Sequence, residues 1–321
     1  MGRPYEDVYS SLKGKMPIDV EPKNPTMDKK LVITVAPCGS YIGREQNPYQ
    51  PFTPKEVARA AIESYDAGAS AWHVHVRYED GLACKDPNII RETIDMVLDE
   101  RPDMVISNNV NADLSLPPPD RQRPIVDPLI QMGAQSGRKY IETVVITPTT
   151  VSGAYNAPVV TDAMLKAEVE YLQGKGVKCE FQIHDYKSIP RIKRLLMDTG
   201  LLPKPAIMNL ILGFHAVQIT PSVPDPWGHV YMMSMLQAMP EGAVVGATAG
   251  GHNWLPLTIE AIMLGVDCVR VGMEDAIWMY PHKDEKIKSA ADVVHKVATI
   301  AKELGREIAT PAETRKMWGL R

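Results

Sequence analysis

Residues 71–77 read Ala-Trp-His-Val-His-Val-Arg, and the interpretation of the whole chain starts from this stretch. Side chains alternate between the two faces of a β-strand, so His73, His75 and Arg77 share one face while Trp72 and its apolar neighbours share the other. The apolar face predicts a buried strand. Two imidazoles at this spacing on a rigid strand can bind one metal ion through neutral ring nitrogens, with a third ligand from elsewhere. The alternative is a strand whose polar face meets solvent.

The composition favours a globular protein that binds small molecules. The chain has 321 residues, of which 45% are hydrophobic, and α/β barrels of this length often form one domain. The formal net charge is -4 and the basic residues are scattered, which gives no footprint for nucleic acid. The four cysteines show no C-x-x-C spacing, so neither a disulfide framework nor a cysteine-rich zinc site is indicated.

Residues 1–30 are polar and rich in proline, and they predict an irregular N-terminal arm before a catalytic barrel domain of residues 31–321. The arm could wrap the body of the protein or a neighbouring subunit. It lacks the continuous apolar segment of a signal peptide, and no stretch approaches the roughly 20 apolar residues of a membrane span. We therefore expect a cytoplasmic protein without a membrane partner.

Eight short apolar segments alternate with helical segments along the chain. The segments interpreted as strands are residues 31–36, 71–77, 104–108, 140–145, 177–184, 206–212, 243–248 and 267–274. The helices between and after them are expected at residues 53–68, 87–99, 125–132, 162–174, 190–197, 229–239, 255–264 and 289–305. This alternation predicts a (β/α)8 TIM barrel. An open nucleotide-binding sheet is disfavoured because no G-x-G-x-x-G or Walker-type loop follows a strand.

Polar residues fall at the predicted carboxyl ends of the strands, which is where barrel active sites are built. His73 and His75 lie late in the second strand, and Glu274 closes the eighth. Those strands flank the first strand in a closed barrel, so Glu274 can reach an ion held by the histidines. A His-His-Glu set leaves one position open for water or substrate, as catalytic zinc sites require. The alternative for Glu274 is an exposed acid at a strand end.

Arg270 is expected on the inward face of the eighth strand, below Glu274. An unpaired buried guanidinium is costly, so an acid must lie nearby, and Asp275 and Glu180 are the candidates. Such a pair could orient a carboxylate base or bind a substrate carboxylate, or it could be a purely structural ion pair.

Four segments carry a family resemblance. They are residues 33–36 followed by Gly39, the H-x-H-x-R run of 73–77 with Asp80-Gly81, residues 105–107, and the R-x-G-x-E-D run of 270–275. In this order they resemble the β-keto acid cleavage enzyme family, which includes the 3-keto-5-aminohexanoate cleavage enzymes. The resemblance extends from about Leu31 to the end of the chain.

The resemblance implies a zinc-dependent barrel enzyme that exchanges a β-keto acid with acetyl-CoA by a retro-Claisen step, giving acetoacetate and a new acyl-CoA. It also implies a homo-oligomer, such as a tetramer. Residues are assigned to roles by position. His73, His75 and Glu274 match the zinc ligands, Arg270 and Asp275 match a proton-transfer pair, and Ser107, Asn109 and Thr143 match the part of the site that holds the substrate carboxylate.

This sequence departs from the family pattern at three places. Tyr41 stands where the aminohexanoate enzymes have an acid, so a different substrate side chain is expected if that acid recognises an ammonium group. Gln182 replaces the second acid of the fifth strand, which leaves Glu180 to assist Asp275 in catalysis. The loop of residues 108–111 is also more polar than the family's Thr-Gly-Gly version.

Two other functions fit some of these residues. A zinc-dependent barrel hydrolase would use a metal-bound water, with His184 on the fifth strand as a further ligand. Such enzymes usually have the H-x-H pair on the first strand and further histidines on the fifth and sixth strands. The sixth strand of this chain has Asn209 in place of a histidine. A zinc-stabilised or small-molecule-binding barrel without turnover is the third interpretation.

Overall fold

The computed structural model describes residues 23–110, 116–149, 159–213 and 227–320. Most of the predicted N-terminal arm lies outside these ranges, and so do Asn111 to Asp113 of the loop expected after the third strand. The described end of the arm contains a single 3-10 turn, η2 (Pro25–Met27).

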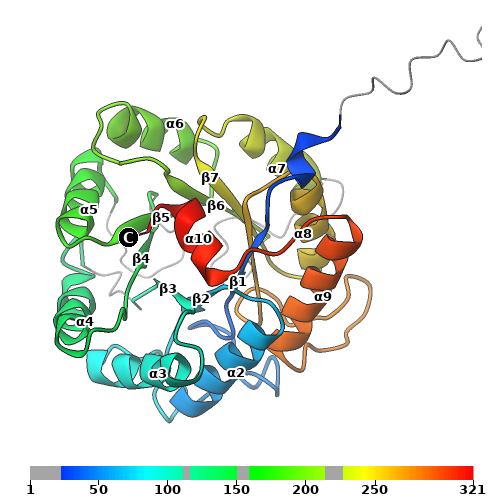
Figure 1. Ribbon diagram of the computed structural model, residues 1–321, viewed down its shortest axis with the longest axis horizontal. Coiled ribbons are helices and arrows are strands. Elements are labelled where there is room, and N and C mark those ends of the chain that lie inside the picture. Colours follow the sequence, from blue (N-terminus) through cyan, green and yellow to red (C-terminus); the bar gives the residue numbers. More distant parts are fainter. Residues whose placement is uncertain (1–22, 111–115, 150–158, 214–226, 321) are drawn as a thin grey trace, which may run out of the picture.

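Eight parallel strands close into a barrel, which confirms the predicted (β/α)8 fold (Figure 1). Each strand pairs with the next along the chain, and the eighth pairs with the first. The strands are β1 (Val32–Val35), β2 (Ala71–Val74), β3 (Val105–Asn108), β4 (Thr143–Ile146), β5 (Lys178–Ile183), β6 (Ile207–Leu212), β7 (Val244–Ala249) and β8 (Cys268–Val271).

The helices surround the barrel in chain order, except for the last one, which lies across one end of the barrel (Figure 1). They are α2 (Pro54–Asp66), α3 (Pro87–Glu100), α4 (Arg123–Ser136), α5 (Asp162–Gly174), α6 (Ser188–Ile192) continued by the π-helical turn η3 (Lys193–Met197), α7 (Trp227–Gln237), α8 (Trp254–Met263), α9 (Ala290–Glu303) and α10 (Pro311–Trp318). In the part of the chain that the structure describes, no helix is long and apolar enough to cross a membrane.

The helix boundaries follow from capping residues. Thr53 caps α2 by accepting a hydrogen bond from the Glu56 backbone, while the Glu56 side chain accepts one from Thr53, a reciprocal capping box. The helix expected at residues 125–132 is longer in the structure, because it runs on to a left-handed Gly137 at its C-cap. The sequence interpretation did not include α10, although Thr310 and Glu313 form the same kind of capping box there.

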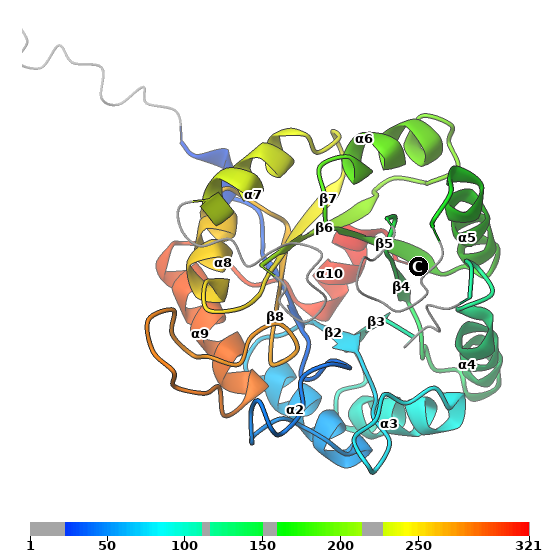
Figure 2. The same cartoon turned by 180° about the vertical axis from the view of Figure 1, so that it is seen from behind.

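The strand side chains alternate between two environments. Outward-facing residues such as Ile33, Trp72 and Val269 pack in the main core under the helices. The inward-facing residues at the strands' amino ends form a separate apolar cluster with Trp318 of α10; they are Val32, Ala71, Val105, Ile207, Val244 and Cys268. Helix α10 therefore covers the amino end of the barrel (Figure 1), and Figure 2 turns the opposite end toward the reader.

The second and eighth predicted strands end earlier than expected at their carboxyl ends. β2 ends at Val74 and β8 at Val271, so His75 and Glu274 lie on the loops that follow these strands. The chain turns at Gly272, where φ is +144° and a Cβ atom would lie 2.1 Å from the Ala36 carbonyl oxygen. Only glycine fits this close approach, and the ladder of β8 ends there.

We expect Trp318→Ala to lower the free energy of unfolding by about 3–5 kcal/mol, because it removes the side chain that fills the amino end of the barrel. Trp318 is fully buried, whereas Lys316 on the same helix is exposed. Lys316→Ala is therefore the matched control and should change stability by no more than about 0.5 kcal/mol. Urea denaturation of both variants tests this prediction. Equal free energies of unfolding for the two variants would contradict the role of Trp318 in filling the amino end of the barrel.

Candidate active site and metal centre

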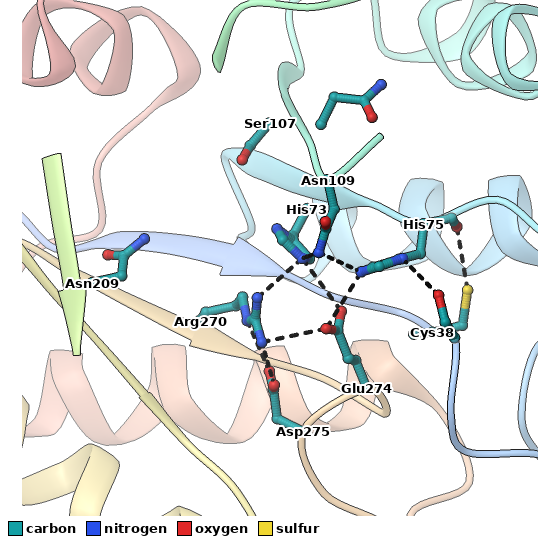
Figure 3. A network of polar contacts seen from close by, with 12 residues as sticks. Cys38, His73, His75, Ser107, Asn109, Asn209, Arg270, Glu274 and Asp275 are labelled. Carbon is teal, nitrogen blue, oxygen red and sulfur yellow. Dashed lines mark hydrogen bonds and ion pairs between the residues drawn. The ribbon is translucent and has the colours of Figure 1, made fainter. Parts of the chain in front are cut away.

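His73, His75 and Glu274 meet at the carboxyl end of the barrel (Figure 3). Their candidate ligand atoms all lie within 4.8 Å of one another. His73 Nε2 is 3.5 Å from Glu274 Oε2, and His75 Nε2 is 3.4 Å from Glu274 Oε1. All three side chains are buried. The structure thus brings together the three residues that the sequence predicted as ligands.

Gly39 makes room for the carboxylate of this group. A Cβ atom at this position would lie 2.5 Å from Glu274 Cγ, so any larger residue would displace the acid. The backbone N–H of Glu274 donates to the Ala36 carbonyl oxygen at 3.2 Å, which anchors the loop after β8 to the end of β1. The exit of β1 therefore positions the third member of the group.

The pKa shifts of His73 and Glu274 favour the forms of these side chains that bind a metal ion. Burial, with a further contribution from the nearby Arg270, lowers the pKa of His73 well below its usual value, so its imidazole is neutral. Burial alone would raise the pKa of Glu274, but Arg270 and the two imidazoles hold it below its usual value. Neutral imidazole and ionised carboxylate are the metal-binding forms of these side chains.

The surroundings of the three residues also suit a cation. Among the described residues, Glu274 Oε2 is buried with no hydrogen-bond partner. The Nε2 atom of His73 faces two donors, Arg270 Nη1 at 3.0 Å and Asn109 Nδ2 at 3.3 Å. The Nε2 atom of His75 faces Asn109 Nδ2 at 2.8 Å, so the lone pairs of both rings point toward one place. Two imidazole nitrogens and one carboxylate are a donor set typical of a three-ligand catalytic zinc site.

The outer nitrogen of His75 is held by the loop after β1. His75 Nδ1 lies 3.3 Å from Ser40 Oγ, and Cys38 Sγ donates to the His75 carbonyl oxygen at 3.3 Å. Partners of this kind fix the tautomer and orientation of a ligating imidazole. Neither residue was predicted from the sequence to belong to the site, although both lie in the Pro-Cys-Gly-Ser segment of residues 37–40 that follows the first strand.

Arg270 makes a two-pronged ion pair with Asp275. Its Nε and Nη2 atoms donate to the two carboxylate oxygens at 3.1 and 2.5 Å, and Nη2 also lies 3.4 Å from Glu274 Oε1. Of the two acids expected beside Arg270, the structure pairs it with Asp275. Burial raises the pKa of Asp275 to about 7 although Arg270 opposes the shift, so a proton can be gained or lost near neutral pH.

Glu180 of β5 lies inside the barrel and accepts hydrogen bonds from side chains of β3, β4 and β6. Its Oε2 atom accepts from Ser107 Oγ at 2.7 Å and Thr143 Oγ1 at 3.0 Å, and its Oε1 atom accepts from Asn209 Nδ2. Burial raises the pKa of Glu180. The hydroxyls of Ser107 and Thr143 therefore donate to a protein carboxylate. The sequence signal for Asn209 was a polar residue within an otherwise apolar strand.

The remaining predicted residues lie around this group. Tyr41 is 54% exposed, and partial burial together with the negative charge of Glu274 raises its pKa. Gln182 is half-buried on β5, opposite Asn209 in the register. His184 is buried, and burial lowers its pKa to about 4. In the described ranges His184 is not part of the ligand group, so the geometry does not support the fourth ligand that a hydrolase would use.

Arg77 has a structural role in the loops that follow β1 and β2. Its guanidinium donates to the backbone carbonyl oxygens of Gly81, Gly39 and Ile42. These contacts tie the loop after β2 to the loop after β1. Arg77 therefore stabilises the loop that carries His75 against the loop that carries Gly39.

This fold and this site define a class: a parallel α/β barrel with a buried His-His-Glu centre and an arginine–carboxylate pair beside it. Residues 30–320 match the model of the beta-keto acid cleavage enzyme family. The chain belongs to the β-keto acid cleavage enzyme family, which confirms both the predicted resemblance and the expectation of an enzyme.

Individual relatives agree with this assignment. The chain is 31% identical to a 3-keto-5-aminohexanoate cleavage enzyme from Fusobacterium nucleatum over 92% of this chain and 100% of the relative. It is 25% identical to a 3,5-dioxohexanoate:acetyl-CoA acetone transferase from Paraburkholderia graminis, over 91% of this chain and 96% of the relative. The apo structure of ObcA, at 19% identity, superposes with a TM-score of 0.67 over 85% of this chain and 66% of that chain, which supports the fold.

We expect Arg270→Met to lower the free energy of unfolding of the metal-free protein by about 3–5 kcal/mol, because two buried carboxylates lose their counter-ion. The double variant R270M/D275N should recover part of that loss, since one of the stranded charges is removed with little change of shape. Chemical denaturation of Arg270→Met, Asp275→Asn and the double variant, compared with the unsubstituted protein, forms a double-mutant cycle. Strictly additive effects would show that the pair is not coupled.

Proposed function

We propose that the protein is a zinc-dependent β-keto acid cleavage enzyme that uses acetyl-CoA as co-substrate. In the balanced reaction, R–CO–CH2–COO⁻ and CH3–CO–SCoA give R–CO–SCoA and CH3–CO–CH2–COO⁻, which is acetoacetate. The observation that supports this proposal most directly is the His73–His75–Glu274 group beside the Arg270–Asp275 pair, in a chain of this family. The acetyl-CoA transferase named among the relatives supports the co-substrate.

His73, His75 and Glu274 would hold the zinc ion, which when bound would act as a Lewis acid toward the keto oxygen of the substrate. Asp275 is the proposed general base. It takes a proton from carbon 2 of the β-keto acid, whose acidity comes from the keto group beside it. Arg270 orients Asp275 through two hydrogen bonds and keeps part of its charge compensated.

The substrate carboxylate is proposed to lie beside Ser107 and Asn109, near the end of β3, and Thr143, which is paired with Ser107 at the start of β4. Because the two hydroxyls donate to Glu180, a second carboxylate can approach only if Glu180 is protonated. The raised pKa of Glu180 favours that state. The protonated Glu180 and the substrate carboxylate would then both lie beside the Ser107 and Thr143 hydroxyls. In this state Glu180 carries a proton that can assist Asp275 in proton transfer.

Purified protein supplied with zinc is expected to convert a β-keto acid and acetyl-CoA into acetoacetate, measured by a coupled acetoacetate assay. His75→Ala should abolish this, because it removes a proposed ligand of the Lewis acid. Removing the metal with a chelator should have the same effect, and zinc should restore activity. His295→Ala, at an exposed position on α9, is the matched histidine control and should leave activity unchanged. A metal-loaded protein that releases no acetoacetate from a broad panel of β-keto acids would refute the proposal.

The side chain at position 41 is expected to select the substrate. Tyr41 is exposed on the loop after β1, and the charge of Glu274 contributes to its raised pKa. Tyr41→Glu adds a negative charge there and should shift the ratio of kcat/KM toward cationic β-keto acids, relative to apolar ones, by about tenfold, which corresponds to about 1.4 kcal/mol. Tyr41→Phe is the control and should leave the ratio unchanged. If both substitutions change the kcat/KM ratio equally, the charge at position 41 does not determine substrate preference.

A further inference from the structure

Asn109 is the first residue after β3, and its side chain reaches the place where the two imidazoles point (Figure 3). Its Nδ2 atom lies 2.8 Å from His75 Nε2 and 3.3 Å from His73 Nε2. A single amide therefore contacts both of the nitrogen atoms that would bind a metal ion. The Glu274 carboxylate lies on another side of the same two nitrogens.

The backbone around Asn109 is held in an uncommon conformation. Val110 has φ +56° and is fully buried, although a β-branched residue rarely adopts a positive φ. The Asn108 Oδ1 atom accepts a hydrogen bond from the Val110 N–H at 2.7 Å, and the Asn109 N–H donates to the Val74 carbonyl oxygen at 3.3 Å. This turn holds the backbone from which the Asn109 side chain extends. Strain kept in one place near a site is commonly functional.

The amide cannot keep this orientation when a metal ion is present. The NH2 group is a donor, and a cation bound to the two Nε2 atoms would take the lone pairs that the NH2 group now faces. Rotation of the carboxamide by half a turn about the Cβ–Cγ bond exchanges Nδ2 for Oδ1 without moving the backbone. The group that faces the cation is then a neutral oxygen.

We propose that Asn109 is a displaceable fourth metal ligand, which closes the His73–His75–Glu274 centre through Oδ1 until a substrate oxygen replaces it. This inference rests on the metal of the proposed function and assigns a role to a residue outside the three-ligand set. A neutral amide oxygen is a weaker ligand than a carboxylate, so a substrate oxygen can displace it. Once displaced, the Nδ2 group can donate to the substrate.

The test is the zinc affinity of the full-length protein, measured by competition with a chromogenic chelator. Asn109→Ala should weaken zinc binding about 10- to 100-fold, the range for loss of a group that supports a metal centre. Asn109→Asp keeps an oxygen in the same place and adds charge, so it should bind zinc at least as tightly as the unsubstituted protein. Because that carboxylate resists displacement, the same variant should have a lower kcat. Asn88→Ala, an exposed asparagine at the start of α3, is the matched control and should change neither value.

A crystal structure of the zinc-loaded protein without substrate gives the direct readout, with Oδ1 expected at a bonding distance from the ion. Equal zinc affinities of N109A and the unsubstituted protein would overturn the proposal. A crystal structure in which the Asn109 carboxamide points away from the zinc ion would also overturn the proposal. If acetoacetate is still formed in that case, only the role of Asn109 is refuted. If the protein binds no zinc at all, both proposals are refuted.

Discussion

The pairing of β8 with β1 closes the sheet, and the candidate centre depends on this ladder. Thr34 of β1 is in register with Arg270 on one side and with Ala71 on the other. One strand therefore brings the exit of β8, with its acids, next to the exit of β2, with its histidines. Residues almost 200 positions apart in the sequence then lie within hydrogen-bonding distance, as between Arg270 and His73.

Charge compensation at the carboxyl end follows from the same closure. Arg270 is buried and contacts Asp275, Glu274 and the His73 ring. A guanidinium without acids at this depth would be costly, and two acids without it would be protonated or displaced. The arginine keeps Glu274 ionised and fixes the orientation of Asp275. Because the Arg270 side chain points into the barrel at the end of β8, one guanidinium can form ion pairs with both acids.

The barrel has two functionally different ends because its inward side chains change character along the strands. At the amino end the inward residues are apolar and pack on α10, which excludes water from that side. One step further along the strands they are polar, as Ser107, Glu180 and Asn209 show. In the described ranges this polar layer is linked by hydrogen bonds, so the site is built on rigid strands. The loops that follow the strands contribute Tyr41, His75, Asn109, Glu274 and Asp275.

The sequence by itself determined the alternation of strands and helices, the two-residue periodicity of the histidines and the family, because these depend on local spacing and residue type. It also predicted which side chains share a face, since that follows from the pleat. Only the tertiary structure decided where β2 and β8 end, which acid pairs with Arg270, and that Ser107 and Thr143 donate to Glu180. Those outcomes depend on contacts between distant strands and on the close approach at Gly272, which local spacing does not encode.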